Sequence, residues 1–476
     1  MTLIELFILI VPLFLIQRVI YRLWFHPLAR FPGPKLAAST SLYAAYFNLV
    51  RGGQYTMKLP ELHRKYGPIV RTYPNELHIH DKEAYDQVFS IGTSFDKYRP
   101  FYDHPFGEGS HFNMPDLKTS KSRRDMFAPY LSKATVRKME PLIRETLLHF
   151  IEILLQAGKE GQVINLTKGY HSFTTDAFLN YGWRRPFHAM EYTNFQFPSI
   201  AYMNDFLIGA VLIRTFHPLI RNIFSKCRQL VLDVMRDPDS ENTLFSNLLA
   251  RHSKDSGMTD CSPLSVNDLT AETIVFLVGG EESTANTLIH GTFHILNNDA
   301  IKSHLLQELY ENIPDINALP DSLALEKLPY LTAVIKESLR FTHGPPGRLP
   351  RVVPAAGARL CGRDIPPNTI VSMSHYVYHN DEKIFPNPEA FMPERWMGDD
   401  SHYLDKHLIS FSKGSRGCIG INLAYAELYL AFAYIFRVLD LDLHETQAED
   451  LEWRDFYAPI TKGQLKVTAC GRNSVH

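Results

Sequence analysis

The chain is poor in cysteine and carries almost no excess of charge of either sign. Its 476 residues include five cysteines, an odd number of widely scattered residues: Cys227, Cys261, Cys361, Cys418 and Cys470. This argues against a disulfide framework and favours a reducing compartment. The formal net charge of −2 provides no global basic field, so we do not expect nucleic-acid binding.

Internal repeats, low-complexity tracts, Gly/Ser-rich linkers and long runs of like charge are also missing. The composition is 45% hydrophobic and 12% aromatic, enough to bury a large core. Long helical patterns separated by proline-marked loops dominate the middle and C-terminal half, while the clearest strands are short, at residues 69–73, 77–80 and 369–373. We therefore expect one mainly α (α+β) domain with a small sheet over residues 41–476.

Residues 1–24 contain the long apolar run of the chain. Residues 6–16 are uninterrupted apolar side chains, and the whole stretch approaches the roughly 20 residues that span a bilayer. Basic residues follow this stretch and none precedes it, which predicts a retained anchor with the rest of the chain in the cytosol. Residues 25–40 are proline-rich and predict an extended hinge. A buried core helix is the alternative interpretation of the N-terminus.

The most informative segment reads Phe-Ser-Lys-Gly-Ser-Arg-Gly-Cys-Ile-Gly, from Phe411 to Gly420. Gly414 allows a turn with positive φ that aims backbone N–H groups at Cys418, and the stretch that follows is strongly helical. Both features predict a lowered pKa for the thiol. Arg416 is placed to pair with a carboxylate, and Gly420 leaves room for a flat ligand. No second Cys or His lies nearby, which disfavours zinc; an inert buried cysteine is the alternative.

This run resembles the signature of the cytochrome P450 superfamily, Phe-x-x-Gly-x-Arg-x-Cys-x-Gly, at every fixed position. The resemblance covers nearly the whole chain and implies the cytochrome P450 fold. It implies that the cofactor is haem b, with the Cys418 thiolate as the axial ligand of the iron. Phe411, Gly414, Arg416 and Gly420 would line the cofactor.

Ser265 and Asp268 resemble a capping box that opens a helix running to about residue 296. Two adjacent glycines, at 279–280, stand in its middle, where each costs about 1 kcal/mol relative to alanine. A groove or local opening of the helix would explain them.

The residues after these glycines resemble the oxygen-binding stretch of the family. By that register Glu282 is the acid and Ser283 the alcohol that deliver protons during dioxygen activation, with Thr284 beside them. Serine replaces the usual threonine, which keeps the hydroxyl and loses the methyl that restricts χ1. Taken alone, the segment also fits a solvated pair of glutamates with a packed serine.

Glu337 and Arg340 lie three residues apart in a helix that Pro329 starts. In the family this pair is internal and is joined by a second arginine, which matches Arg395 here. The resemblance assigns the three residues to a structural network that supports the cysteine loop.

Two further arginines match positions that contact the haem propionates in related proteins. Arg351 is the first, with Arg348 assigned a structural role. Arg124 is the second, although the Trp or His often found four positions earlier is Ser120 in this chain.

The resemblance also implies partners. Nothing in the chain resembles a flavin or nicotinamide domain, so electrons would come from NADPH-cytochrome P450 reductase, with cytochrome b5 as a further candidate. The proline-rich segment resembles fungal microsomal members, which implies an endoplasmic reticulum membrane location with the domain facing the cytosol. Such members hydroxylate or epoxidise apolar secondary metabolites, of terpenoid, polyketide or alkaloid type, including mycotoxin-like compounds. The stretches that would line the pocket are mixed aromatic and aliphatic: 98–113, 195–212, 342–349 and 457–460.

Two other functions stay open at this point. One is a haem-thiolate isomerase or dehydratase that needs no reductase. The other is a non-catalytic, membrane-anchored haem protein.

Overall fold

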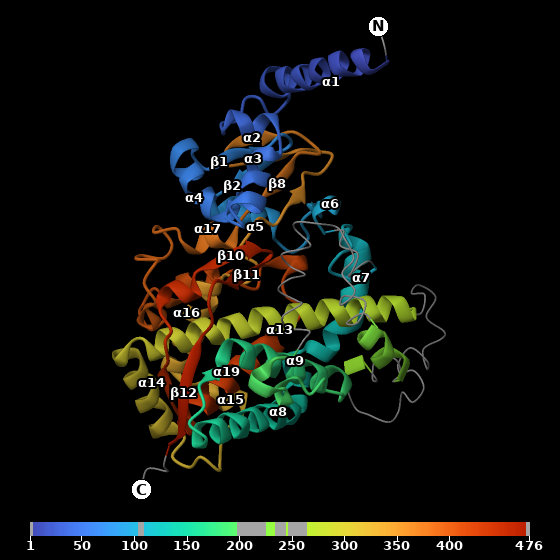
Figure 1. Ribbon diagram of the computed structural model, residues 1–476. Coiled ribbons are helices and arrows are strands. Elements are labelled where there is room, and N and C mark those ends of the chain that lie inside the picture. Colours follow the sequence, from blue (N-terminus) through green and yellow to red (C-terminus); the bar gives the residue numbers. More distant parts are fainter. Residues whose placement is uncertain (1–2, 103–108, 198–224, 234–243, 246–263, 473–476) are drawn as a thin grey trace.

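A long helix, α13 (Val266–Leu296), crosses the middle of the molecule in the computed structural model (Figure 1). The structure describes residues 3–102, 109–197, 225–233, 244–245 and 264–472. The Ser265 hydroxyl accepts a hydrogen bond from the Asp268 N–H, and the Asp268 carboxylate accepts one from the Ser265 N–H. The predicted capping box and both ends of this helix are therefore confirmed.

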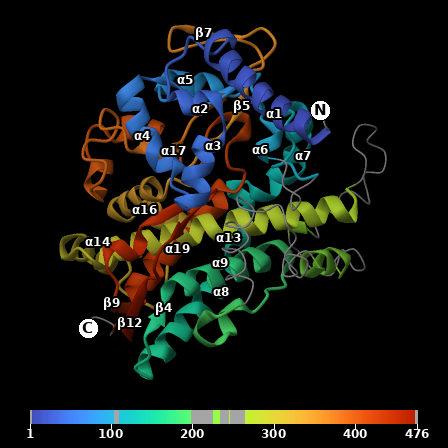
Figure 2. The same cartoon turned by 45° about the horizontal axis from the view of Figure 1, so that its top comes forward.

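Four long helices pack around α13 and on one another to form the main core (Figures 1 and 2). The crossing is close at Gly291, because a Cβ there would collide with the Phe432 ring and lie 2.5 Å from Ser338 Oγ. One of the four, α19 (Ile421–Val438), is long and apolar enough by composition to cross a membrane, but 72% of it is buried, as in a core helix. These helices are α8 (Lys133–Lys159), α9 (Leu166–Trp183), α16 (Pro329–Thr342) and α19 (Ile421–Val438), with α14 (Asp299–Asn312), α15 (Ser322–Leu325) and α18 (Ser401–His407) beside them.

A five-stranded sheet occupies the N-terminal end of the molecule, in the order β1-β2-β8-β5-β3. Only β2 and β8 pair in parallel. Its strands are β1 (Ile69–Tyr73), β2 (Glu76–Ile79), β8 (Ile370–Ser372), β5 (Arg351–Val352) and β3 (Asp96–Lys97). The three predicted strands are confirmed to within one residue at each end, as is the mainly α fold with little sheet.

Short helices surround this sheet, and three smaller strand groups complete the fold. The helices are α2 (Lys35–Ser39), α3 (Leu42–Ala45), α4 (Tyr55–Tyr66), α5 (Lys82–Val88), α6 (Arg99–Tyr102), α7 (Leu117–Phe127) and α17 (His375–His379). The strand groups are β4 (Ile164–Asn165) with β12 (Lys466–Gly471) and β9 (Leu439–Leu443), β6 (Ala358–Leu360) with β7 (Arg363–Ile365), and β10 (Trp453–Phe456) with β11 (Ala458–Thr461).

The N-terminal helix α1 (Leu3–Ile20) extends away from the body of the molecule (Figure 1). The residues after it are docked on the sheet. Arg22 donates to the Ser39 carbonyl at 2.6 Å, and the buried Arg71 of β1 donates to the Arg22 carbonyl at 2.8 Å. A Cβ on Gly33 would collide with the backbone of Arg71. The proline-rich segment is therefore packed against β1 along part of its length.

Candidate active site

The loop that carries Cys418 lies between a 3-10 turn, η7 (Gly414–Arg416), and the start of α19. Gly414 has φ +67°, and a Cβ there would collide with the Phe89 carbonyl and lie 2.5 Å from the backbone of Ser90. The Cys418 N–H donates to the Phe411 carbonyl at 2.8 Å. The predicted positive φ is thus confirmed, and the close approach to the end of α5 makes glycine necessary at this position.

Cys418 has an exposed side chain although protein surrounds it, so its sulfur faces an internal space. Burial raises the pKa of the thiol, and this outweighs the lowering effects of the Gly420 N–H and of Arg124. The sequence-based expectation of a lowered pKa is therefore wrong for the protein without a metal. A bound metal ion would supply the missing positive charge, because it deprotonates a coordinating thiol outright.

Four cationic side chains converge near this loop from four separate segments. Lys97 is buried in β3, Arg351 is buried in β5, Arg124 belongs to α7 and Arg416 to η7. Burial lowers the pKa of Lys97 well below its usual value, and the three arginines lower it further. Within the described part of the chain, none of the four forms an ion pair with a carboxylate.

The contacts of these cations leave donors available. Lys97 donates to the Phe112 carbonyl at 2.6 Å, Arg124 to the Gly417 carbonyl at 2.7 Å and Arg351 to the Tyr102 hydroxyl at 2.8 Å. Arg416 donates to three backbone carbonyls at 2.7, 2.8 and 3.4 Å, while its buried Nε has no partner. Four cations held together without an acid require an anionic ligand. The two propionates of a haem meet this requirement, so the residues present fit that cofactor.

Helix α13 presents a short accessible strip at the predicted glycine pair. Gly279 and Ser283 are exposed, one turn apart, although most of this helix is buried. A Cβ on Gly279 would meet no atom within 4 Å, so open space lies in front of it. The Ser283 hydroxyl donates to the Gly279 carbonyl at 2.7 Å, which leaves its oxygen lone pairs free to accept a hydrogen bond.

The other two predicted catalytic residues are buried beside this strip and are not part of its accessible surface. Glu282 is buried, and it accepts a hydrogen bond from Asn286 at 3.0 Å. Thr284 is buried too, and its hydroxyl hydrogen-bonds the carboxyl of Glu427 in α19. The structure therefore puts the Thr284 hydroxyl outside the accessible strip, and we leave this residue out of the proposed chemistry.

Glu337 and its partners form the buried network that the resemblance implied. The Glu337 carboxylate accepts two hydrogen bonds from Arg340 at 2.9 Å, one from Arg395 Nε at 3.1 Å and one from Trp396 Nε1 at 2.9 Å. Arg348 forms an ion pair with Glu76 and does not join the four cations. The network lies among α16, η6 (Pro393–Trp396) and the segment before it.

Sequence reasoning missed several charged residues of this region. Lys97 carries no motif, and its place among the arginines depends on the pairing of β3 with β5. His111 pairs with Glu272 at 2.6 Å, and His171 pairs with Glu281 at 2.5 Å. Buried pairs between distant segments leave no spacing pattern from which they could have been predicted. Among the stretches expected to line a pocket, residues 103–108 and 198–212 lie outside the described residues, as does Cys261.

The comparison with protein families agrees with this site. Residues 34–467 match the sequence model described as Cytochrome P450. The chain belongs to the cytochrome P450 family, whose members carry a cysteine-ligated haem and receive electrons from a redox partner.

Its relatives include several enzymes of known name, all cytochrome P450 monooxygenases from fungi. The chain is 33% identical over 483 residues to ankB of Aspergillus thermomutatus, which covers 95% of this chain and 91% of the relative. It is 34% identical over 462 residues to astB of Aspergillus terreus, covering 91% and 90%. It is 35% identical over 484 residues to aflU of Aspergillus parasiticus, covering 95% of each chain. This chain is a cytochrome P450 monooxygenase.

Proposed function

We propose that this monooxygenase hydroxylates or epoxidises an apolar small molecule in fungal secondary metabolism. The observation that supports it is the combination of an accessible Cys418, four clustered cations without a carboxylate partner among the described residues, and the open strip of α13 at Gly279 and Ser283. The relatives support the reaction class, since each is named a cytochrome P450 monooxygenase.

The haem would be held by Cys418 at the iron and by Lys97, Arg124, Arg351 and Arg416 at the propionates. When bound, it supplies dioxygen activation with a strong electron push from the thiolate. The protein supplies orientation, electrostatic support and proton supply. The four cations are prearranged by backbone and phenolic acceptors, so that binding the two carboxylates requires little reorganisation.

Ser283 and Glu282 would move protons at this site. The Ser283 hydroxyl is accessible and already oriented by the Gly279 carbonyl, so it can accept a proton on one side and donate one on the other. Glu282 is adjacent in sequence and is buried among polar groups, which suits an acid that exchanges its proton.

The electron donor and the location of the protein are part of the same proposal. We expect NADPH-cytochrome P450 reductase to deliver the electrons, with cytochrome b5 as a second donor. The exposed apolar side chains of Leu13, Phe14, Leu15, Ile16 and Trp24 support a membrane anchor in residues 1–24, and the endoplasmic reticulum membrane with a cytosolic domain is the location we propose.

Two measurements test this function. The dithionite-reduced protein should give a strongly red-shifted Soret band with carbon monoxide. Cys418→Ala should lose that band, while Cys470→Ala, at an exposed cysteine of β12, should keep it. Next, apolar fungal metabolites are screened with reductase and NADPH. Oxygenated product that requires both supports the proposal, whereas conversion without reductase would identify an isomerase or dehydratase.

A further inference from the structure

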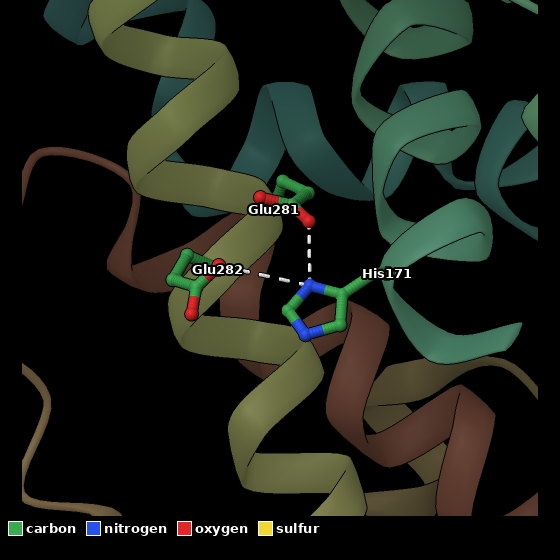
Figure 3. A group of neighbouring side chains, drawn as sticks. All are labelled: His171, Glu281 and Glu282. Carbon is green, nitrogen blue, oxygen red and sulfur yellow. Dashed lines mark hydrogen bonds and ion pairs between the residues drawn. The ribbon is translucent and has the colours of Figure 1, made fainter. Parts of the chain in front are cut away.

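A cluster of three ionisable side chains is buried between α9 and α13 (Figure 3). His171 comes from α9, and Glu281 and Glu282 come from α13. One ligand atom from each lies within 4.8 Å of the other two. The exposed fractions are 4%, 2% and 5%, so all three are removed from solvent.

The contacts within the cluster centre on His171. Its Nδ1 lies 2.5 Å from Glu281 Oε1 and 3.7 Å from Glu282 Oε2 (Figure 3). Around them, Asn286 donates to Glu282 Oε1 at 3.0 Å, and Thr174 donates to the Glu281 backbone carbonyl at 3.1 Å. The second oxygen, Oε2, of each glutamate is buried without a hydrogen-bond partner.

The charges of this cluster do not balance. An imidazolium and two carboxylates sum to −1, and within the described residues no lysine or arginine forms an ion pair with either glutamate. A net charge inside the protein is costly, so the cluster needs one more proton or a cation.

The contacts favour a proton over a cation. His171 Nδ1 and Glu281 Oε1 are only 2.5 Å apart, a direct hydrogen-bond contact that leaves no space for an ion between the two atoms. Two ligands each about 2 Å from a zinc ion would lie farther apart than this. The pKa values agree with a proton. Burial raises the pKa of Glu282 to about 7. Burial lowers the pKa of His171, but the two glutamates outweigh it and bring the value to about 9.

We propose that His171, Glu281 and Glu282 form a proton store that keeps Glu282 a neutral acid between turnovers. His171 and Glu281 are positioning residues, and Glu282 is the donor. When Glu282 gives up its proton to the relay that includes the neighbouring Ser283, the cluster is left with a net charge of −1, and uptake of one solvent proton restores neutrality. The inference rests on the proposed function, because it assigns the source of the protons used there.

The test detects the proton on Glu282 by infrared spectroscopy of the reduced, carbon-monoxide-bound holoenzyme. Infrared difference spectra on photolysis of the carbon monoxide should contain a protonated-carboxyl band that shifts in D₂O and is absent in Glu282→Gln. The pH midpoint of this band should rise in His171→Gln, which removes a positive charge, and fall in Glu281→Gln, which removes a negative one. Each shift should be about one unit or more, as expected for charges within 4–6 Å.

Glu140→Gln is the matched control. Glu140 is also buried, but it lies in α8, away from the cluster, and pairs with Arg144 of the same helix at 2.9 Å. It should leave the band and its midpoint unchanged. Coupling of NADPH use to product should decline as pH rises, with midpoints that move as the band does.

Three results would overturn the proton store: no such band in the wild type at any pH, midpoint shifts of the same sign in the two variants, or one equivalent of a divalent metal that all three cluster variants lose. Failure of the proposed function is a separate observation. It would appear as absence of reductase-dependent product from any metabolite, whatever the infrared band does.

Discussion

Ser283 differs from the threonine usual at its position by one methyl group. Its hydroxyl keeps the hydrogen bond to the Gly279 carbonyl, at 2.7 Å, but its χ1 is less restricted. Ser283→Ala should leave the carbon monoxide spectrum intact and send electrons to peroxide, with a several-fold drop in product formed per NADPH. Ser283→Thr should match or exceed the wild-type coupling. Stoichiometry of NADPH, peroxide and product measures both.

Thr284→Val is the companion variant, because the hydroxyl of Thr284 is directed at Glu427. Its coupling should stay at the wild-type level. Uncoupling in Thr284→Val together with normal coupling in Ser283→Ala would show that the register assigned to this helix is wrong.

Lys97 should destabilise the haem-free protein but strengthen haem binding. In the haem-free protein its pKa is lowered well below the usual value, so the unfolded chain binds more protons and the free energy of unfolding rises with pH. Lys97→Met should stabilise the haem-free protein and flatten this pH dependence. With haem bound, the same change removes a charged hydrogen bond to a propionate.

The loss of that hydrogen bond should be measurable as faster release of haem. A hydrogen bond to a charged group contributes roughly 1.5–3 kcal/mol, so haem transfer to apomyoglobin should be about tenfold faster or more. Denaturant unfolding of the haem-free protein is measured in parallel. Slower haem release, or a destabilised haem-free protein, would contradict the role given to Lys97.

For single residues, motifs can be predicted from the sequence, whereas the residues that contact one another across the fold cannot. Cys418, Arg416 and the acid–alcohol pair lie at fixed spacings within single segments, so they can be found by pattern. Lys97 and His171 act through residues more than a hundred positions away, and such contacts exist only after the chain folds. The pKa of Cys418 was predicted in the wrong direction because local donors can be inferred from sequence whereas burial of the sulfur cannot.

Helix α13 contains glycines with different structural roles. A Cβ at Gly291 would collide with Phe432 of α19 and lie 2.5 Å from Ser338 Oγ of α16, whereas one at Gly279 would meet nothing within 4 Å. Gly291→Ala should lower the free energy of unfolding by about 1–3 kcal/mol, since forcing atoms into a packed core costs this much.

Gly279→Ala should stabilise the helix by up to about 1 kcal/mol, as alanine is the better helix former. It should also place a methyl group in the open strip beside Ser283 and weaken substrate binding. Thermal unfolding and substrate-induced spectral shifts measure the two effects. Equal destabilisation by both substitutions would show that the space in front of Gly279 is filled.

Element boundaries were the part of the fold best predicted. The capping box placed the start of α13, Pro329 placed the start of α16, and alternation placed β1 with its correct ends. The Glu337 network was implied by resemblance alone, because an i,i+3 pair looks the same on an exposed helix face as in a core. The docking of the proline-rich segment on β1 was not foreseen, since it depends on contacts of Arg71 with a carbonyl 49 residues away.

For the whole molecule, truncation can separate the membrane anchoring that we propose for α1 from the contact of Arg22 with the sheet. Deleting residues 2–20 removes α1 and should move the protein from the membrane to the soluble fraction with its carbon monoxide spectrum unchanged. Deleting residues 2–25 also removes the Arg22 carbonyl that accepts from the buried Arg71.

The longer deletion should therefore cost about 1–3 kcal/mol of stability relative to the shorter one, the penalty for a buried donor left without a partner. Fractionation and denaturant unfolding of both truncated proteins give the comparison. Equal stability of the two would mean that the Arg22 contact adds nothing to the fold.

The contact of Gly414 with the end of α5 has a consequence for biogenesis. The Gly92 N–H donates to Ser415 in the same contact, so the cysteine loop is completed by residues 323 positions earlier in the chain. Closing so long a loop adds little to the entropic cost, which grows only logarithmically, but such distant contacts form slowly. During synthesis the iron ligand leaves the ribosome long after the segment that follows α5, against which its loop packs. Cofactor capture should thus be the final, rate-limiting event in maturation. Cells starved of haem should accumulate a helical, haem-free precursor that can still bind haem when it is supplied.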